Sequence, residues 1–182
     1  MLGPTTLVVS ALALAAAVGG AKAGDFHLTS SDIAEGKTLP EAQVFYGSGY
    51  HGGNHSPALA WSGEPAGTKS FAVTVFDPDA PTGRGWWHWT VFNIPASIHA
   101  LPAGVTARTL PQGAIEGITD FKKPGYGGAA PPAGKPHHYV FTVYALDVER
   151  LELSANADGH AVAKAAAAHV LAKSSITTLF GR

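Results

Sequence analysis

Short apolar runs separated by glycine and proline dominate the middle of the chain. Three runs are rich in β-branched and aromatic residues and predict β-strands: Ser70–Asp77, Trp87–Ile94 and His138–Leu146. In the second run, a period of two places His88 on one face and both Trp87 and Trp89 on the other. Both faces are largely apolar, so we expect a central strand that is covered on each side.

A helix is predicted near the C-terminus, from about Asp158 to Lys173. This segment is rich in alanine, which has the highest helix propensity, and its larger apolar residues recur near one side. Asp158 is suited to cap the first turn, and Lys173 would place a positive charge in the last turn. Several strands followed by one late helix predict a mainly β domain.

Residues 110–135 contain so many glycines and prolines that they exclude a helix. A stretch of this length without regular structure is more often functional than idle, which makes it a candidate part of a site. The composition after residue 23 stays mixed, without repeats or a second linker, so residues 24–182 are expected to form one domain.

The first 23 residues have the features of a secretory signal peptide. An apolar stretch, Leu7–Val18, precedes the small-x-small sequence Ala21-Lys22-Ala23, and it is short for a bilayer span. No lysine or arginine precedes the apolar stretch, so an uncleaved anchor is the alternative. We expect a periplasmic or secreted protein without stable membrane insertion after processing.

The overall charge and the missing motifs exclude several function classes. Twelve basic and 13 acidic residues give a net charge of −1, which does not favour nucleic acid or anionic membranes as partners. Cysteine is absent, so thiol catalysis is excluded. No nucleotide-phosphate motif, metalloprotease motif or nucleophile elbow occurs, and glycines break the segment of His51 and His55, so neither a cofactor nor a metal is expected.

Two carboxylates end the first predicted strand. Asp77 and Asp79 flank Pro78, and Pro81 restricts the residue before it, so a stiff turn holds both side chains. Burying a carboxylate at the end of an apolar strand is costly unless hydrogen-bond donors surround it. The two side chains therefore either cap backbone amides of the turn or belong to a polar site.

Two histidines on predicted strands are further candidates. A carboxylate of the turn could accept a proton from one ring nitrogen of His88 and leave the other nitrogen free for a ligand. A structural core histidine is the alternative. His137 follows the glycine-rich loop and shares a strand face with Tyr139, whereas His138 points to the opposite face.

Four segments, in this order and spacing, resemble the phosphatidylethanolamine-binding protein family, and most closely its bacterial Raf-kinase-inhibitor-like members. They are NHSPALAW (54–61), FAVTVFDPDAP (71–81), HWTVFNIP (88–95) and GYGGAAPPAGKPHHYVFTVYALD (125–147). The resemblance implies a large antiparallel sheet packed on a smaller sheet, with a C-terminal helix. It also implies a small surface pocket for an anionic head group, lined by Asp77, Asp79, His88, His137 and Tyr139, with Pro131 and Pro132 at its rim and Tyr126 as a further contact.

The chain departs from the family pattern at two places. Ala129 and Ala130 stand where proline or cysteine is common before the Pro-Pro pair, which would leave the rim more mobile. Phe180 replaces the tyrosine of the usual C-terminal ending, so it can pack on the domain but cannot donate a hydrogen bond.

We expect a binding protein without catalytic residues, metal or cofactor, whose partner is an anionic small molecule or a phospholipid head group. Imidazolium groups and amides of the glycine-rich loop would donate to the anion, while the carboxylates hold the histidines in their donor forms. One alternative is an inhibitor or regulator of a protein partner, such as a kinase or protease. Another is a weak hydrolase that uses His88 and Asp77, or a Zn²⁺ site formed by His88, His137 and the aspartates.

Overall fold

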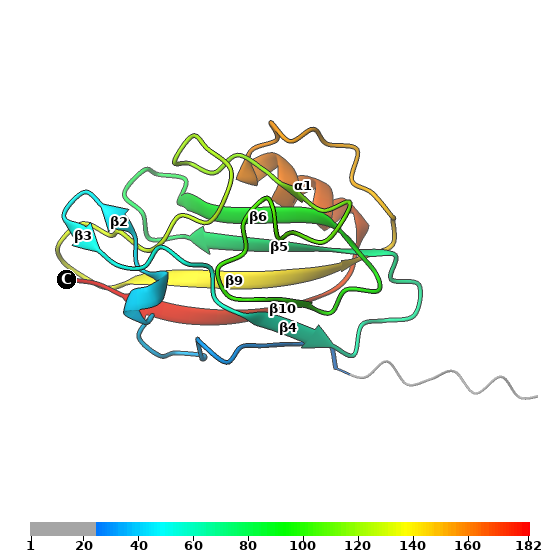
Figure 1. Cartoon of the computed structure of the whole chain (residues 1–182), viewed down its shortest axis with the longest axis horizontal. Coiled ribbons are helices and arrows are strands. Elements are labelled where there is room, and N and C mark those ends of the chain that lie inside the picture. The colour runs from blue at the N-terminus through cyan, green and yellow to red at the C-terminus, as the bar shows by residue number, and fades with distance from the viewer. Residues whose placement is uncertain (1–24) are drawn as a thin grey trace, which may run out of the picture.

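The computed structural model describes residues 25–182, which are built around a five-stranded antiparallel sheet (Figure 1). The signal peptide predicted for residues 1–23 lies outside the described residues. Within residues 25–182, no helix has the length and apolar character that a bilayer crossing requires. The elements are β1 (His27–Thr29), a 3-10 helix (Glu41–Gln43), β2 (Tyr46–Gly47), β3 (Tyr50–His51), β4 (Leu59–Ser62), β5 (Ser70–Asp77), β6 (Trp86–Pro95), β7 (Ala100–Leu101), β8 (Ile115–Glu116), β9 (His137–Leu146), α1 (Gly159–His169) and β10 (Val170–Phe180).

The large sheet has the strand order β10-β9-β5-β6-β8 and is covered on both faces. The three-stranded sheet β1-β4-β7 packs on one face, where Trp61 of β4 meets Phe71 of β5 with ring centroids 5.3 Å apart. Helix α1 covers the other face, where Val162 packs in a cluster with Phe92 of β6. The predicted large sheet on a smaller sheet, with a late helix, is confirmed, as are the three strands predicted from the apolar runs.

The helix ends earlier than predicted. Asp158 caps it as expected, because its side chain accepts a hydrogen bond from the Ala161 amide at 2.8 Å. The helix stops at His169, however, and Lys173 lies in strand β10, which pairs with β9 from Val170 to Phe180 with an irregularity at Leu171. The helix-favouring residues of 170–173 are overridden there by backbone pairing with β9.

The outer edge of β10 is covered by the segment before the 3-10 helix. The amide of Gly36 donates to Thr177 at 2.8 Å, and that of Leu39 donates to Leu179 at 2.8 Å. The amide of Leu179 donates back to Lys37 at 3.0 Å. These hydrogen bonds cover the C-terminal part of the β10 edge against pairing with another chain.

A β-bulge in β6 changes the faces predicted for its side chains. Val75 pairs with Trp89 and Phe76 pairs with Trp87, so His88 is an extra residue in the ladder. Trp87 consequently packs against Phe76 in a tilted arrangement on the α1 side, with ring centroids 4.3 Å apart, while Trp89 lies in the opposite core. The predicted alternation of Trp87 and Trp89 with His88 was therefore wrong: His88 lies on the same side of the sheet as Trp89.

Candidate functional site

The site lies where β5 ends and β6 and β9 begin. Antiparallel pairing places Asp77 opposite Trp86, and Phe76 opposite Val140, so three strand ends meet at one end of the sheet. The turn between β5 and β6 is tight at Gly85, where φ is +73° and an added Cβ would lie 2.2 Å from the Phe76 ring. This turn brings Asp77 and His88 to the same end of the sheet as His137 and Tyr139 of β9.

Asp77 holds His137. The two side chains are buried, and Oδ2 of the carboxylate lies 2.7 Å from Nδ1 of the imidazole. The other oxygen, Oδ1, accepts the Asp79 amide at 2.8 Å. Both carboxylate oxygens are therefore occupied, so Asp77 orients His137 through Nδ1–H and leaves Nε2 to face the cavity.

His88 is held by backbone carbonyls rather than by a carboxylate. Its Nδ1 lies 2.8 Å from the Gly127 oxygen and 3.1 Å from the Gly128 oxygen, and the ring packs edge-on against Tyr139 with centroids 5.1 Å apart. The expectation that a carboxylate of the turn would hold this ring was wrong for His88 and fits His137 instead. The predicted pair of His88 and Asp77 does not form as a hydrogen bond.

The glycine-rich loop holds His88 through carbonyls, and three of its amides are used within the fold. The Gly127 amide donates to His88 O at 2.8 Å, and the Gly128 amide donates to Asn54 Oδ1 at 2.8 Å. The Ala129 amide donates to Gln43 O at 3.3 Å. These three amides are therefore used within the fold and are not available as anion donors.

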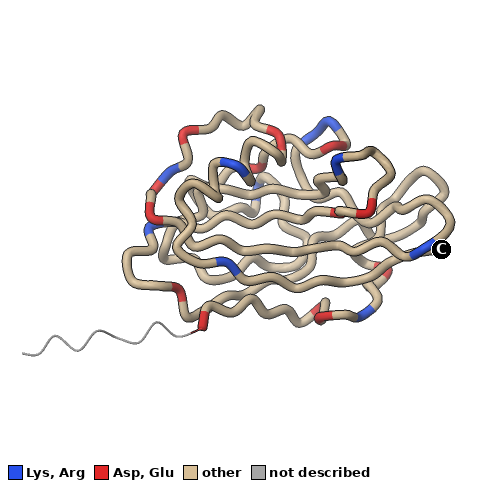
Figure 2. Tube along the Cα trace, turned by 180° about the vertical axis from the view of Figure 1, so that it is seen from behind, with Lys and Arg blue, Asp and Glu red and all other residues tan. Residues whose placement is uncertain are grey.

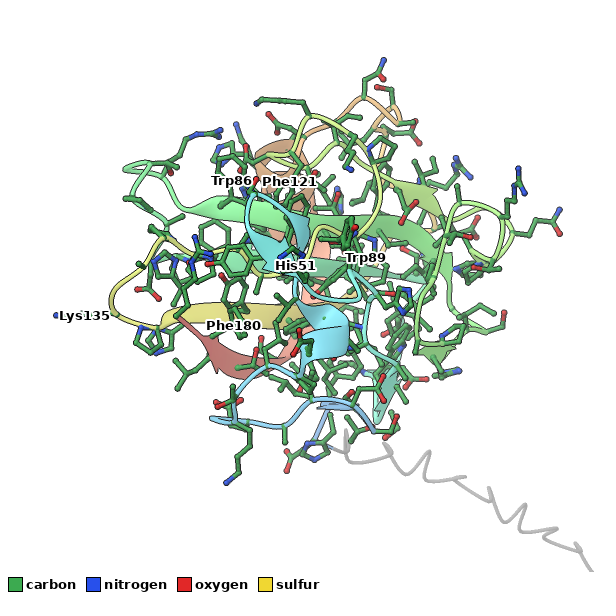
Figure 3. The ribbon with its side chains drawn as sticks, turned by 60° about the vertical axis from the view of Figure 1, so that its left-hand side comes forward. His51, Trp86, Trp89, Phe121, Lys135 and Phe180 are labelled. Carbon is green, nitrogen blue, oxygen red and sulfur yellow. The ribbon has the colours of Figure 1, made fainter. Side chains whose placement is uncertain are left out.

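A cavity of about 300 Å³ opens at this end of the sheet. Its polar end is formed by Asp77, His88 and His137, and the ring of Tyr139 lines the cavity beside them. Its wall is aromatic: Trp86 and Phe121 pack edge-to-face at 5.4 Å, and Phe45 stacks on Phe121 at 4.9 Å. Figure 3 shows Trp86 and Phe121 side by side. Pro131 and Pro132 line the cavity, together with Pro81.

Two residues expected at the pocket have other roles. Asp79 accepts both the backbone amide and Nδ1 of His138 at 2.7 Å, on the exposed side of the strand. These hydrogen bonds lower the pKa of the Asp79 carboxyl, chiefly through the backbone amide. Tyr126 does not line the cavity; it donates its hydroxyl to Gln43 O at 2.9 Å and packs on the Trp89 ring.

The aromatic wall was not predicted from the sequence. Trp86 belongs to the run before His88, and its side chain was not assigned a role, while Phe45 and Phe121 come from loops far apart in the sequence. A signal existed only for Trp86, as an aromatic residue directly before the pocket strand. The chain path that brings Phe45 and Phe121 together has no local signature.

The charge around the cavity is low. Figure 2 shows that basic and acidic residues of the described chain alternate along the trace without a long run of one sign. Among residues 25–182, no lysine or arginine lines the cavity, and the Lys135 side chain extends away from the domain (Figure 3). Burial lowers the pKa of His88, although the Gly127 carbonyl and the Asp77 charge favour its protonated form. Burial and the Asp77 charge raise the pKa of Tyr139.

The C-terminus of the chain lies close to this end of the sheet. The Phe180 ring packs near the Tyr50 ring with centroids 6.2 Å apart, which confirms its expected packing role. The Tyr50 hydroxyl donates to the Pro131 carbonyl, and the Arg182 guanidinium lies 4.2 Å above the Tyr50 ring. Tyr50 thereby ties the proline rim to the body of the domain.

Within the described residues, no three histidine or acidic side chains come together as a group that could hold a metal ion. The Zn²⁺ site considered for His88, His137 and the aspartates therefore has no support in the geometry. Asp77 uses both oxygens within the protein, and Asp79 faces His138.

Comparisons with known proteins agree with this fold. The family model described as phosphatidylethanolamine-binding protein matches residues 29–181. The UPF0098 protein YbcL of Escherichia coli (strain K12) is 50% identical over 96% of this chain and 97% of its own, and the E. coli protein YbhB is 52% identical over 84% and 98%.

Solved structures give the same result. The crystal structure of E. coli YbcL, described as a new member of the mammalian PEBP family, covers 87% of this chain and 99% of its own with a TM-score of 0.85 and 50% identity. A structure of CT736 from Chlamydia trachomatis, described as a putative PEBP homologue, covers 87% and 98% with a TM-score of 0.74 and 26% identity. The chain belongs to the phosphatidylethanolamine-binding protein family.

Proposed function

We propose that the protein is a non-enzymatic binding protein whose cavity takes a small oxyanion, such as phosphate or a phosphorylated head group. The observation that carries this proposal is the convergence of two buried imidazoles, His88 and His137, whose Nδ1 atoms are fixed by the protein. Neither Nε2 has a hydrogen-bond partner among the described residues, and neither is sealed from solvent. Both atoms are therefore free for a ligand.

His137 supplies the main donor in this proposal. When the ring is protonated, the Asp77 carboxylate at Nδ1 balances its charge and Nε2–H points to the ligand. A charge-assisted hydrogen bond of this kind is worth about 1.5–3 kcal/mol. The anion is thus held by a local dipole and an imidazolium, without lysine or arginine.

The aromatic wall favours an oxyanion that carries a short apolar group. Trp86, Phe121 and Phe45 face the same cavity as the imidazoles, so an alkyl substituent on the anion would pack against them. A cavity of about 300 Å³ accommodates a head group but not a lipid chain. We therefore propose a phosphate or short phosphate ester as the ligand.

Among the described residues, no serine or threonine hydroxyl at the cavity is paired with a histidine base, which favours binding over nucleophilic catalysis. A nucleophile needs a base within hydrogen-bond reach. Thr82 donates its hydroxyl to the Gly85 carbonyl at 2.7 Å, and no serine or threonine hydroxyl hydrogen-bonds to His88 or His137 among the described residues. Hydrolysis by His88 and Asp77 also lacks the hydrogen bond that such a pair requires.

Adjacent histidines provide a matched test. His137 faces the cavity, whereas His138 is exposed and bonded to Asp79. Calorimetric titration of the purified protein with phosphate and phosphoethanolamine at pH 6.5 should show millimolar or tighter binding. His137→Gln should weaken it by about tenfold or more, because a charge-assisted hydrogen bond is lost, while His138→Gln stays within about twofold of wild type. Equal effects of both substitutions, or no binding by wild type, would contradict the proposal.

A further inference from the structure

We propose that the cavity selects an oxyanion that still carries a proton, such as hydrogen phosphate or a singly protonated phosphate monoester, because Nε2 of His88 faces it as a hydrogen-bond acceptor. This inference rests on the function proposed above and specifies its ligand. It assigns to His88 a selective role that is distinct from the donor role of His137.

The tautomer of His88 follows from its surroundings. A carbonyl oxygen accepts hydrogen bonds and cannot donate them, so Nδ1, which lies 2.8 Å and 3.1 Å from two carbonyl oxygens, carries a hydrogen. The Gly127 and Gly128 carbonyls are fixed in turn, because their own amides bond to His88 O and Asn54 Oδ1. In the neutral ring, Nε2 therefore has a lone pair and no hydrogen.

The groups around the ring favour the neutral form on balance. His88 is almost completely buried, with 3% of its surface exposed, and burial disfavours the imidazolium. The Asp77 and Asp120 charges act in the opposite direction, as do the two carbonyls, while Phe121 and Tyr139 contribute only ring contacts. His137 also lines the cavity, and its protonation would further disfavour a second positive charge on His88.

An acceptor in the cavity discriminates between oxyanions of similar shape. A P–OH group can donate to Nε2, whereas an unprotonated oxygen would place its lone pair against that of the nitrogen. A phosphate diester, which is the form in an intact phospholipid, has no P–OH. The cavity is therefore expected to prefer free phosphate and monoesters over the phosphate of an intact lipid.

Two ligand pairs test this preference in the wild-type protein. Hydrogen phosphate and sulfate are both tetrahedral dianions at pH 7.5, and they differ in one proton. Calorimetry should show sulfate binding about tenfold or more weaker than phosphate, since an unsatisfied acceptor of this kind costs that much affinity. At pH 5.5, monomethyl phosphate is mainly a singly protonated monoanion, and it should bind better than dimethyl phosphate, which has the same charge without the proton.

Nitrogen chemical shifts give an independent measurement. The His88 signals, assigned by their loss in His88→Gln, should report a protonated Nδ1 and an unprotonated Nε2 at pH 7.5, and Nε2 should shift when phosphate binds. Sulfate binding as tight as phosphate, or a protonated Nε2, would overturn the inference and leave the anion cavity standing. Failure of both anions to bind at millimolar concentration would overturn the proposed function and this inference together.

Discussion

Removing the hydroxyl of Tyr139 should stabilise the protein. The Tyr139 side chain is 1% exposed, and its oxygen has no hydrogen-bond partner of normal geometry among the described residues, although the Ala130 amide lies near enough to favour the ionised form. A buried hydroxyl without a partner costs about 1–3 kcal/mol. Tyr139→Phe keeps the ring that packs on His88 and removes this cost, so the free energy of unfolding should rise by about 1 kcal/mol.

A second buried tyrosine is the matched control. Tyr126 is 8% exposed and donates its hydroxyl to Gln43 O at 2.9 Å, so Tyr126→Phe loses a hydrogen bond and should lower the free energy of unfolding by about 1 kcal/mol. In a domain of this size, these changes shift the melting temperature by about 2–4 °C in opposite directions. Thermal denaturation monitored by circular dichroism measures both.

Phosphate titration of the same variants separates stability from binding. The Tyr139 hydroxyl is sealed from solvent, so Tyr139→Phe should bind phosphate within about twofold of wild type. A Tyr139→Phe variant that melts as low as Tyr126→Phe would show that the hydroxyl is hydrogen-bonded in solution. A large loss of affinity would show that the hydroxyl turns to the ligand.

Three further predictions concern stability. Burial raises the pKa of Glu116, whose Oε1 accepts Trp89 Nε1–H at 2.9 Å. The protonated carboxyl therefore stabilises the folded state, and this contribution is lost as pH rises through the raised pKa. Urea unfolding should find Glu116→Gln more stable than wild type at pH 7 and equal to it at pH 4. Gly159→Ala, whose Cβ would lie 2.2 Å from Cγ of Trp87, should cost about 1–3 kcal/mol in the same assay. The lowered pKa of Asp79 means that its contribution is lost as pH falls through that pKa, so Asp79→Asn should reduce the stability lost between pH 5 and pH 3, by a small amount because the carboxylate is exposed.

The strands could be predicted from sequence because local composition determines them. The runs that became β5, β6 and β9 are apolar, β-branched and bounded by turn residues, and their limits agree with the structure within one residue. Strand β10 could not be predicted in this way. Its first residues continue an alanine-rich helical pattern, and only pairing with β9, 24 or more residues earlier in the chain at every paired position, makes them extended.

Three polar members of the site could be predicted, but their partners could not. Asp77, His88 and His137 lie at strand ends that antiparallel pairing brings together, so their convergence follows from the strand assignment. Which imidazole meets the carboxylate depends on the path of the loop around Gly127 and on one extra residue in β6. Neither leaves a periodic signal in the sequence, and the aromatic wall depends on the same long-range contacts.

The β-bulge at His88 connects the register of the sheet to the chemistry of the cavity. Without the extra residue, strict alternation from Trp89 would place His88 on the α1 side, among the cluster that contains Phe92 and Val162. An imidazole there would lie away from Tyr139 and from the carbonyls that hold its Nδ1. The bulge instead puts His88 and Trp89 on one side of the sheet, so that one residue enters the cavity while the next anchors the core. The β-bulge, which strict alternation does not predict, therefore places the hydrogen-bond acceptor of the proposed binding site.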